Sequence, residues 1–188
     1  MKLFTHGGRR AALAIPLAGV TALGVTALSG ATTPAAGAVT HPACRTSQLV
    51  VWQGLPGSGT AGSIYYELQF SNVSSTACAM VGFPGVSAVS STGTQLGSAA
   101  ARDHSFAPRT VVLAPGATAH AVLRIVDAGA FPAASCRPVT ATGLKVYPPN
   151  TTTAEVMPFR FAACSRKGPV FLYVRTVRPG AGIPGYSQ

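Results

Sequence analysis

Three neighbouring residues, Asp103, His104 and Ser105, have the side chains of a hydrolytic triad. A working triad is built from separate segments of a fold, because adjacent residues rarely reach one another in the required geometry. The chain also has no Gly-x-Ser-x-Gly elbow, the turn that exposes the nucleophilic serine of many hydrolases. We therefore interpret these three residues as part of an exposed loop.

Carboxylates are scarce, with 4 Asp and Glu in 188 residues. Glu67 and Glu155 could form the carboxylate pair of a glycosidase only if the fold brought them together. Glu67 falls on the outward face of a predicted strand, where we expect a solvated charge. With so few acids and no matching motif, we predict no catalytic residue, and a hydrolase is the least favoured alternative.

The glycines of Gly57-x-Gly59-x-x-Gly62 match the dinucleotide-binding fingerprint letter by letter. That chemistry needs a helix directly after the glycines, so that the helix N-terminus meets a phosphate. The residues after Gly62 alternate like a strand instead. We predict a hairpin loop here and no cofactor.

Histidine and methionine together could bind copper, since soft ligands select Cu(I). In residues 39–188 the candidates are spread along the sequence, and no His-x-Met, Met-x-x-Met or clustered histidine occurs. We therefore predict no metal site. The candidates considered are His41, His104, His120, Met80 and Met157.

Basic residues dominate the charge, with 14 Lys and Arg and a formal net charge of +10. Arginine and tyrosine on one sheet face can bind an anionic polymer or stack on sugars. A positive surface that only keeps the protein soluble would explain the same charges. The face that we predict consists of Tyr65, Arg124, Lys145, Tyr147, Tyr173 and Arg175.

The first 38 residues have the pattern of a secretory signal peptide. Lys2, Arg9 and Arg10 precede an uncharged, mostly apolar run, and an Ala-Gly-Ala cleavage site ends at Ala38. We predict cleavage near Ala38 and a secreted, extracytoplasmic protein of the cell envelope; an uncleaved anchor is the alternative. The remaining 150 residues carry 11 Lys and Arg against 4 Asp and Glu, a net charge of +7.

Four cysteines, Cys44, Cys78, Cys136 and Cys164, lie in the exported part. An even count in an oxidising compartment predicts two disulfides, and four cysteines allow three pairings. We favour the pairing of sequence neighbours, Cys44–Cys78 and Cys136–Cys164. Each bond would close a loop of about thirty residues and stabilise the fold by about 3–4 kcal/mol through chain entropy.

Alternating apolar side chains predict the strands that must position all of these residues. Turns with Gly and Pro separate the strands, and no long segment after residue 39 shows a helical period. We predict an all-β fold, an antiparallel immunoglobulin-like β-sandwich of about eight strands. The predicted strands are 49–52, 64–70, 86–89, 110–113, 119–125, 144–146, 154–157 and 170–175.

The sandwich domain is predicted to span residues 39–178. Within it, residues 126–135 read as a loop between strands. From Pro179 onward the sequence PGAGIPGYSQ is rich in Gly and Pro, so we expect residues 179–188 to form a flexible tail.

Several short motifs follow one another in the exported part. They are Phe70-Ser71-Asn72, Cys78-Ala79-Met80-Val81-Gly82-Phe83-Pro84-Gly85-Val86, Val112-Leu113-Ala114-Pro115-Gly116, and Leu144-Lys145-Val146-Tyr147-Pro148-Pro149 between Cys136 and Cys164. Their order resembles domain-of-unknown-function family 4232, exported actinobacterial proteins, over about residues 44–177. The resemblance implies an extracytoplasmic sandwich with local disulfides, and it transfers no catalytic residue. The glycines and prolines suit sharp turns, and Asn72 is expected to cap a strand end.

From these features we predict a non-enzymatic, exported binding or structural domain of the cell envelope. Its partner would be an anionic cell-wall polymer, a membrane surface or another exported protein, and we expect no nucleic acid. The alternative is a secreted protease inhibitor or protein-binding module that presents residues 54–62 or 99–109 as a rigid loop.

Overall fold

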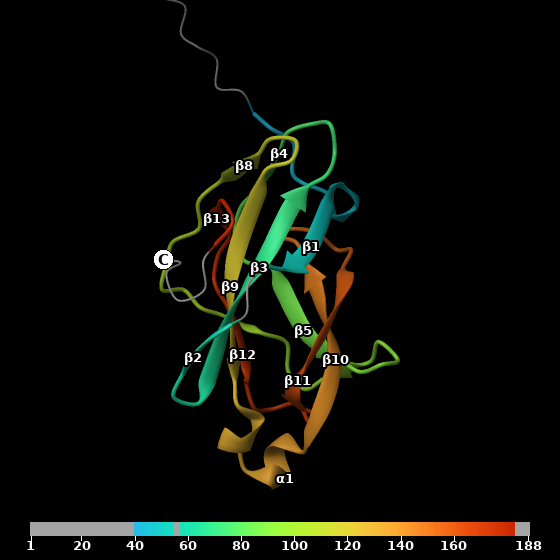
Figure 1. Cartoon of the computed structure of the whole chain (residues 1–188), viewed down its shortest axis with the longest axis vertical. Coiled ribbons are helices and arrows are strands. Elements are labelled where there is room, and N and C mark those ends of the chain that lie inside the picture. The colour runs from blue at the N-terminus through green and yellow to red at the C-terminus, as the bar shows by residue number, and fades with distance from the viewer. Residues whose placement is uncertain (1–39, 55–56, 183–188) are drawn as a thin grey trace, which may run out of the picture. The chain divides into compact units, whose positions relative to one another are not determined.

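The computed structural model describes residues 40–54 and 57–182 (Figure 1). Every element below belongs to the unit Val39–Gln188. The predicted signal peptide and its cleavage site lie outside the described residues. Within the described ranges, no helix is long and apolar enough to cross a membrane.

Two large β-sheets make up the fold. The first has seven strands in the order β1-β3-β9-β12-β7, with β2 paired to β3 and β13 paired to β9. Its strands are β1 (Leu49–Gln53), β2 (Ser58–Thr60), β3 (Ser63–Asn72), β7 (Ala101–Arg102), β9 (Thr118–Val126), β12 (Leu172–Val174) and β13 (Arg178–Pro179).

The second large sheet has four strands in the order β11-β10-β5-β6, and β4 and β8 form a separate two-stranded sheet. These strands are β4 (Cys78–Met80), β5 (Gly85–Val89), β6 (Gln95–Leu96), β8 (Val111–Leu113), β10 (Pro138–Tyr147) and β11 (Glu155–Cys164). The helical elements are η1 (Thr46–Gln48), η2 (Ala128–Ala130) and α1 (Ala133–Cys136).

The prediction of an all-β sandwich is confirmed, whereas the immunoglobulin-like strand arrangement stays a prediction. All eight predicted strands correspond to observed ones, and the described residues form 13 strands in total. The additional strands are two or three residues long, too short for alternation to reveal them. Two details differ from expectation: β12 and β7 pair in parallel, and the predicted loop 126–135 contains η2 and most of α1.

The hydrophobic core consists of the inward side chains of both large sheets. Leu68 and Phe70 of β3 and Leu123 of β9 are fully buried, and Leu144 and Val146 of β10 belong to the same cluster. These residues are the alternate apolar positions of their strands. Burying them fixes which face of each strand points outward.

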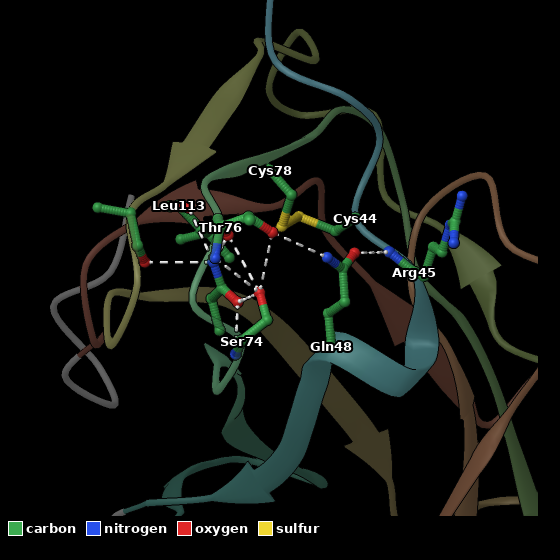
Figure 2. Close-up of a disulfide and its surroundings, with 9 residues drawn as sticks. Cys44, Arg45, Gln48, Ser74, Thr76, Cys78 and Leu113 are labelled. Carbon is green, nitrogen blue, oxygen red and sulfur yellow. Dashed lines mark hydrogen bonds between the residues drawn. A yellow bond between two sulfur atoms is a disulfide. The ribbon is translucent and has the colours of Figure 1, made fainter.

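Both predicted disulfides, Cys44–Cys78 and Cys136–Cys164, are present. The first ties the segment before η1 to β4, and Figure 2 shows it beside Gln48. The second joins the end of α1 to the end of β11. Two disulfides indicate an oxidising, extracytoplasmic environment for the folded chain.

Asn72, the last residue of β3, is fully buried and caps the strand as expected. Its side-chain Nδ2 donates to the backbone carbonyls of Thr76 (2.9 Å) and Leu113 (3.0 Å). Its Oδ1 accepts from the backbone N–H of Ser74 (3.0 Å) and from the Ser74 hydroxyl (2.7 Å). Ser74, Thr76 and Leu113 lie together near the first disulfide in Figure 2, so this one amide joins the β3–β4 turn to β8.

Residues 179–182 do not form the flexible tail that we expected. Pro179 belongs to β13, which pairs with β9, and the carbonyl oxygen of Gly180 accepts a hydrogen bond from His120 Nδ1 at 2.8 Å. The prediction was wrong for these residues because a Gly- and Pro-rich composition gives no information about pairing with a distant strand. Residues 183–188 lie outside the described residues.

Candidate functional site

The segment from Asp103 to Ser105 holds a loop together and does not form a triad. Asp103 Oδ1 accepts hydrogen bonds from the backbone N–H and the hydroxyl of Ser105, and Oδ2 accepts from Arg175 Nε at 3.1 Å. His104 is exposed, and its ring lies against Phe83 with the ring centroids 4.7 Å apart. The interpretation as an exposed loop is confirmed.

The same hydrogen bonds control the charge of Asp103. Partial burial raises its pKa, but the hydrogen bonds from Ser105 and Arg175 outweigh burial, so the pKa lies below the usual value of 3.8. A lowered folded-state pKa stabilises the fold above the unfolded-state pKa, and this contribution is lost as the pH falls through the folded-state pKa.

We expect Asp103→Asn to lower the free energy of unfolding at neutral pH by less than about 1 kcal/mol, because the ion pair is partly exposed. The difference between the two chains should shrink in acid, well below pH 3.8. Urea unfolding at neutral and acidic pH measures both values. A difference that stayed constant with pH would contradict the role given to this carboxylate.

Glu67 is not the solvated charge that we expected. It points outward from β3, but its side chain is only 1% exposed. The C-terminal segment covers it, since a Cβ added to Gly182 would lie 2.6 Å from Glu67 Oε2. Glu155 has a different partner, because its Oε2 accepts from the backbone N–H of Val51 at 3.1 Å. The two carboxylates therefore serve separate contacts.

The glycine-rich segment forms the predicted hairpin. Strand β2 pairs with β3 across a turn at Gly62, whose φ of +72° favours glycine. The strand β3 begins at Ser63, where a dinucleotide site would need a helix. As for metals, no group of three or more His, Cys, Asp or Glu lies together in residues 40–54 and 57–182, and both Met80 and Met157 are buried in the core.

Four of the six predicted face residues lie on the outer side of the seven-stranded sheet. Tyr65 of β3 and Tyr173 of β12 both pair with Arg124 of β9, which lies between them. The Arg124 guanidinium carbon is 4.0 Å from the ring centroid of Tyr173, a close cation–π contact. Arg175 follows two residues after Tyr173, at a position of the same parity.

Two residues that the sequence analysis did not predict, Phe106 and Arg178, extend this group. The guanidinium carbons of Arg175 and Arg178 lie 5.2 and 5.0 Å from the ring centroid of Phe106. No pattern predicted Phe106, which lies in the loop after β7, and Arg178 was missed because β13 is only two residues long. We call this group the Arg124 face; its members are Tyr65, Phe106, Arg124, Tyr173, Arg175 and Arg178.

The other two predicted residues, Lys145 and Tyr147, lie on the four-stranded sheet. Both alternate with the buried Leu144 and Val146 of β10, and Lys145 Nζ is 5.6 Å from the ring centroid of Tyr147. The structure thus distributes the six residues over two sheets. Tyr147 also borders a hollow of about 530 Å³ with Phe83 and Arg102.

The carboxylates leave the positive charge of the Arg124 face largely unbalanced. Asp103 pairs with Arg175, while Asp127 Oδ1 accepts from the backbone N–H of Gly129. Among the residues that the structure describes, Arg175 is the one Arg or Lys with an ion pair. Arg124 and Arg178 therefore form no ion pair, although Glu67 lies at an outward position of the neighbouring strand β3 and contacts His120 at 4.0 Å.

Five buried side-chain atoms of the described chain have no hydrogen-bond partner, and all belong to β3, β9 and β13. Buried polar atoms are nearly always partnered, so these atoms are exceptions among the described residues. Glu67 Oε2 and His120 Nε2, for example, are 4.0 Å apart, too far for a hydrogen bond. The five atoms are Glu67 Oε2, Gln69 Oε1, His120 Nε2, Arg124 Nε and Arg178 Nε.

A second hollow, of about 410 Å³, lies between the β2–β3 hairpin and β11. Its walls include Ile64, Tyr66 and Phe161. Burial raises the pKa of Tyr66, and its ring makes an edge contact with Phe159, with centroids 4.9 Å apart. These contacts continue the hydrophobic core, so this hollow is mainly an extension of the packing between the sheets.

The fold and its bonds define a disulfide-linked, all-β sandwich domain with a basic and aromatic sheet face. The chain belongs to the family described as Domain of unknown function (DUF4232), whose model matches residues 44–177. The match includes all four cysteines and the strands β1 to β12, and the resemblance seen in the motifs is confirmed. No curated protein and no solved structure matches the chain.

Proposed function

We propose that the protein is an exported, non-enzymatic domain of the cell envelope that binds an anionic wall polymer through the Arg124 face. The observation that carries this proposal is that Arg124 and Arg178 lie beside aromatic rings with no carboxylate partner. The signal-peptide pattern of the first 38 residues and the two disulfides support export.

The arrangement of the arginines suits phosphate or carboxylate groups. Nε is buried in both Arg124 and Arg178, so an external oxyanion would meet the terminal Nη groups, which can donate two parallel hydrogen bonds. Contact with Tyr173 or Phe106 also restricts the arginine, so less conformational entropy is lost on binding. The net charge of +7 over residues 39–188 attracts a polyanion over a longer range, and salt screens this attraction.

We expect the purified protein to sediment with cell wall that carries teichoic acid, and much less with the same wall after acid extraction of that polymer. Retention should fall steeply as salt is added. In the double variant Arg124→Gln/Arg178→Gln, the loss of about 1 kcal/mol per arginine near an anionic surface should weaken binding about 30-fold.

A matched control removes the same charge elsewhere. Arg160 and Arg166 are exposed, on β11 and in the turn after it, and the variant Arg160→Gln/Arg166→Gln should change binding less than about threefold. Equal losses in the two double variants would show that only net charge matters. Equal retention on intact and extracted wall would rule out the polymer as the partner.

A further inference from the structure

A groove on the side of the four-stranded sheet brings together three segments that are distant in the sequence. Phe83 comes from the turn between β4 and β5, Arg102 from β7, and Tyr147 from the end of β10. The hollow measures about 530 Å³, within the range of small-ligand pockets. We call it the Phe83–Tyr147 groove.

Core packing does not explain the two aromatic rings. Phe83 and Tyr147 are only half-buried, and neither belongs to the hydrophobic core cluster or packs against it. The Phe83 ring also contacts the exposed His104 ring, with the centroids 4.7 Å apart. The turn beside them is shaped around Tyr147, because a Cβ added to Gly85 would lie 3.3 Å from Tyr147 Cβ. Glycine at this position therefore leaves room for a ring that faces the groove instead of the core.

Positive groups flank both rings. The Arg102 guanidinium carbon is 5.8 Å from the centroid of Phe83, and Lys145 Nζ is 5.6 Å from that of Tyr147. Arg102 is exposed and, within the described chain, has no ion-pair partner, because the adjacent Asp103 binds Arg175. The lining of the groove thus combines two half-buried rings with one cation, Arg102, while Lys145 lies beside Tyr147 and is not part of the lining.

We propose that the Phe83–Tyr147 groove binds one anionic saccharide unit, a sugar ring that carries a carboxylate or phosphate. The C–H face of such a ring is apolar and packs against Phe83 and Tyr147, while its charged group meets the Arg102 guanidinium. This inference rests on the proposed function, since it assigns the repeating unit of the wall polymer to a second site. The Arg124 face would bind the negative groups of the polymer, and the groove would bind one of its sugar rings.

The test uses the purified exported protein, labelled with ¹⁵N and titrated with glucose 6-phosphate, glucuronate, glucose and inorganic phosphate. We expect millimolar binding of the two anionic sugars, with amide shifts in residues 82, 83, 85, 102 and 147. Glucose and phosphate alone should each bind at least about fivefold more weakly, since each lacks one half of the contacts.

Variants then test the groove residues one at a time. Phe83→Leu and Tyr147→Leu should each weaken binding of glucose 6-phosphate about fivefold or more, and Arg102→Gln should abolish its preference over glucose. Arg109→Gln, which removes an exposed charge from the loop after β7, should leave the affinity unchanged.

Two results would overturn the inference. One is the absence of shifts in the groove with every sugar, and the other is equal binding of phosphate and glucose 6-phosphate. If wall retention still depended on Arg124 and Arg178 in either case, the proposed function would stand without the groove. If retention failed while sugar binding persisted, the Arg124 face would be the incorrect part.

Discussion

Reduction of both disulfides is expected to remove about 7 kcal/mol from the free energy of unfolding. The bonds close loops with sequence separations of 34 and 28 residues. In the chain-entropy model each loop is worth about 3–4 kcal/mol, and the loops do not overlap along the chain, so the two contributions add. Because domains of this size are stable by about 5–15 kcal/mol, reduction should remove about half or more of the free energy of unfolding.

Denaturant unfolding of the oxidised and reduced protein measures this loss. The variants Cys44→Ala/Cys78→Ala and Cys136→Ala/Cys164→Ala should each show about half of it, since alanine leaves no buried thiol to reoxidise. The oxidised form of the reductant serves as the buffer control. Coincident unfolding curves with and without reductant would refute the entropic role of the bonds.

Replacing Asn72 by aspartate should destabilise the fold by about 4 kcal/mol, more than replacing it by alanine at about 3 kcal/mol. Both changes remove the Nδ2 donor and leave the buried carbonyl of Leu113 without this partner. Aspartate adds a carboxylate that faces the carbonyl oxygens of Leu113 and Thr76, so its charge is buried against two acceptors.

Urea unfolding of the two Asn72 variants gives the comparison. Ser74→Ala is the control, because it removes only the hydroxyl half of the Oδ1 contacts and should cost about 1 kcal/mol. If aspartate were tolerated as well as alanine, the amide would not act as a donor to β8, and the hydrogen-bond assignment of this side chain would need to be reversed.

The sequence predicts most of the fold, because strand alternation is a local property. Leu68, Phe70 and Leu123 occupy the alternate positions that a two-sheet core requires, and the neighbouring cysteines pair as expected. The strand-capping role of Asn72 could also be predicted, because an asparagine side chain bonds to the backbone only a few residues away.

The candidate site depended on long-range information that alternation lacks. Periodicity shows that Tyr147 and Arg124 each point outward from a strand, but it does not show that their strands join different sheets. The prediction that Glu67 is a solvated charge was wrong for a related reason. Its outward position is correct, yet residues more than a hundred positions later return to cover it, and nothing near Glu67 indicates this.

The hydrogen bond between Glu155 and Val51 hinders strand pairing between copies of this protein. Strand β1 lies at the margin of the seven-stranded sheet, where unpaired N–H groups can recruit a strand from another copy. The Glu155 carboxylate already accepts the Val51 N–H at 3.1 Å, so an incoming chain finds this donor occupied and meets a negative charge. Intermolecular sheet growth from β1, the first step toward fibrils, is opposed at this point by a side chain of the opposite sheet.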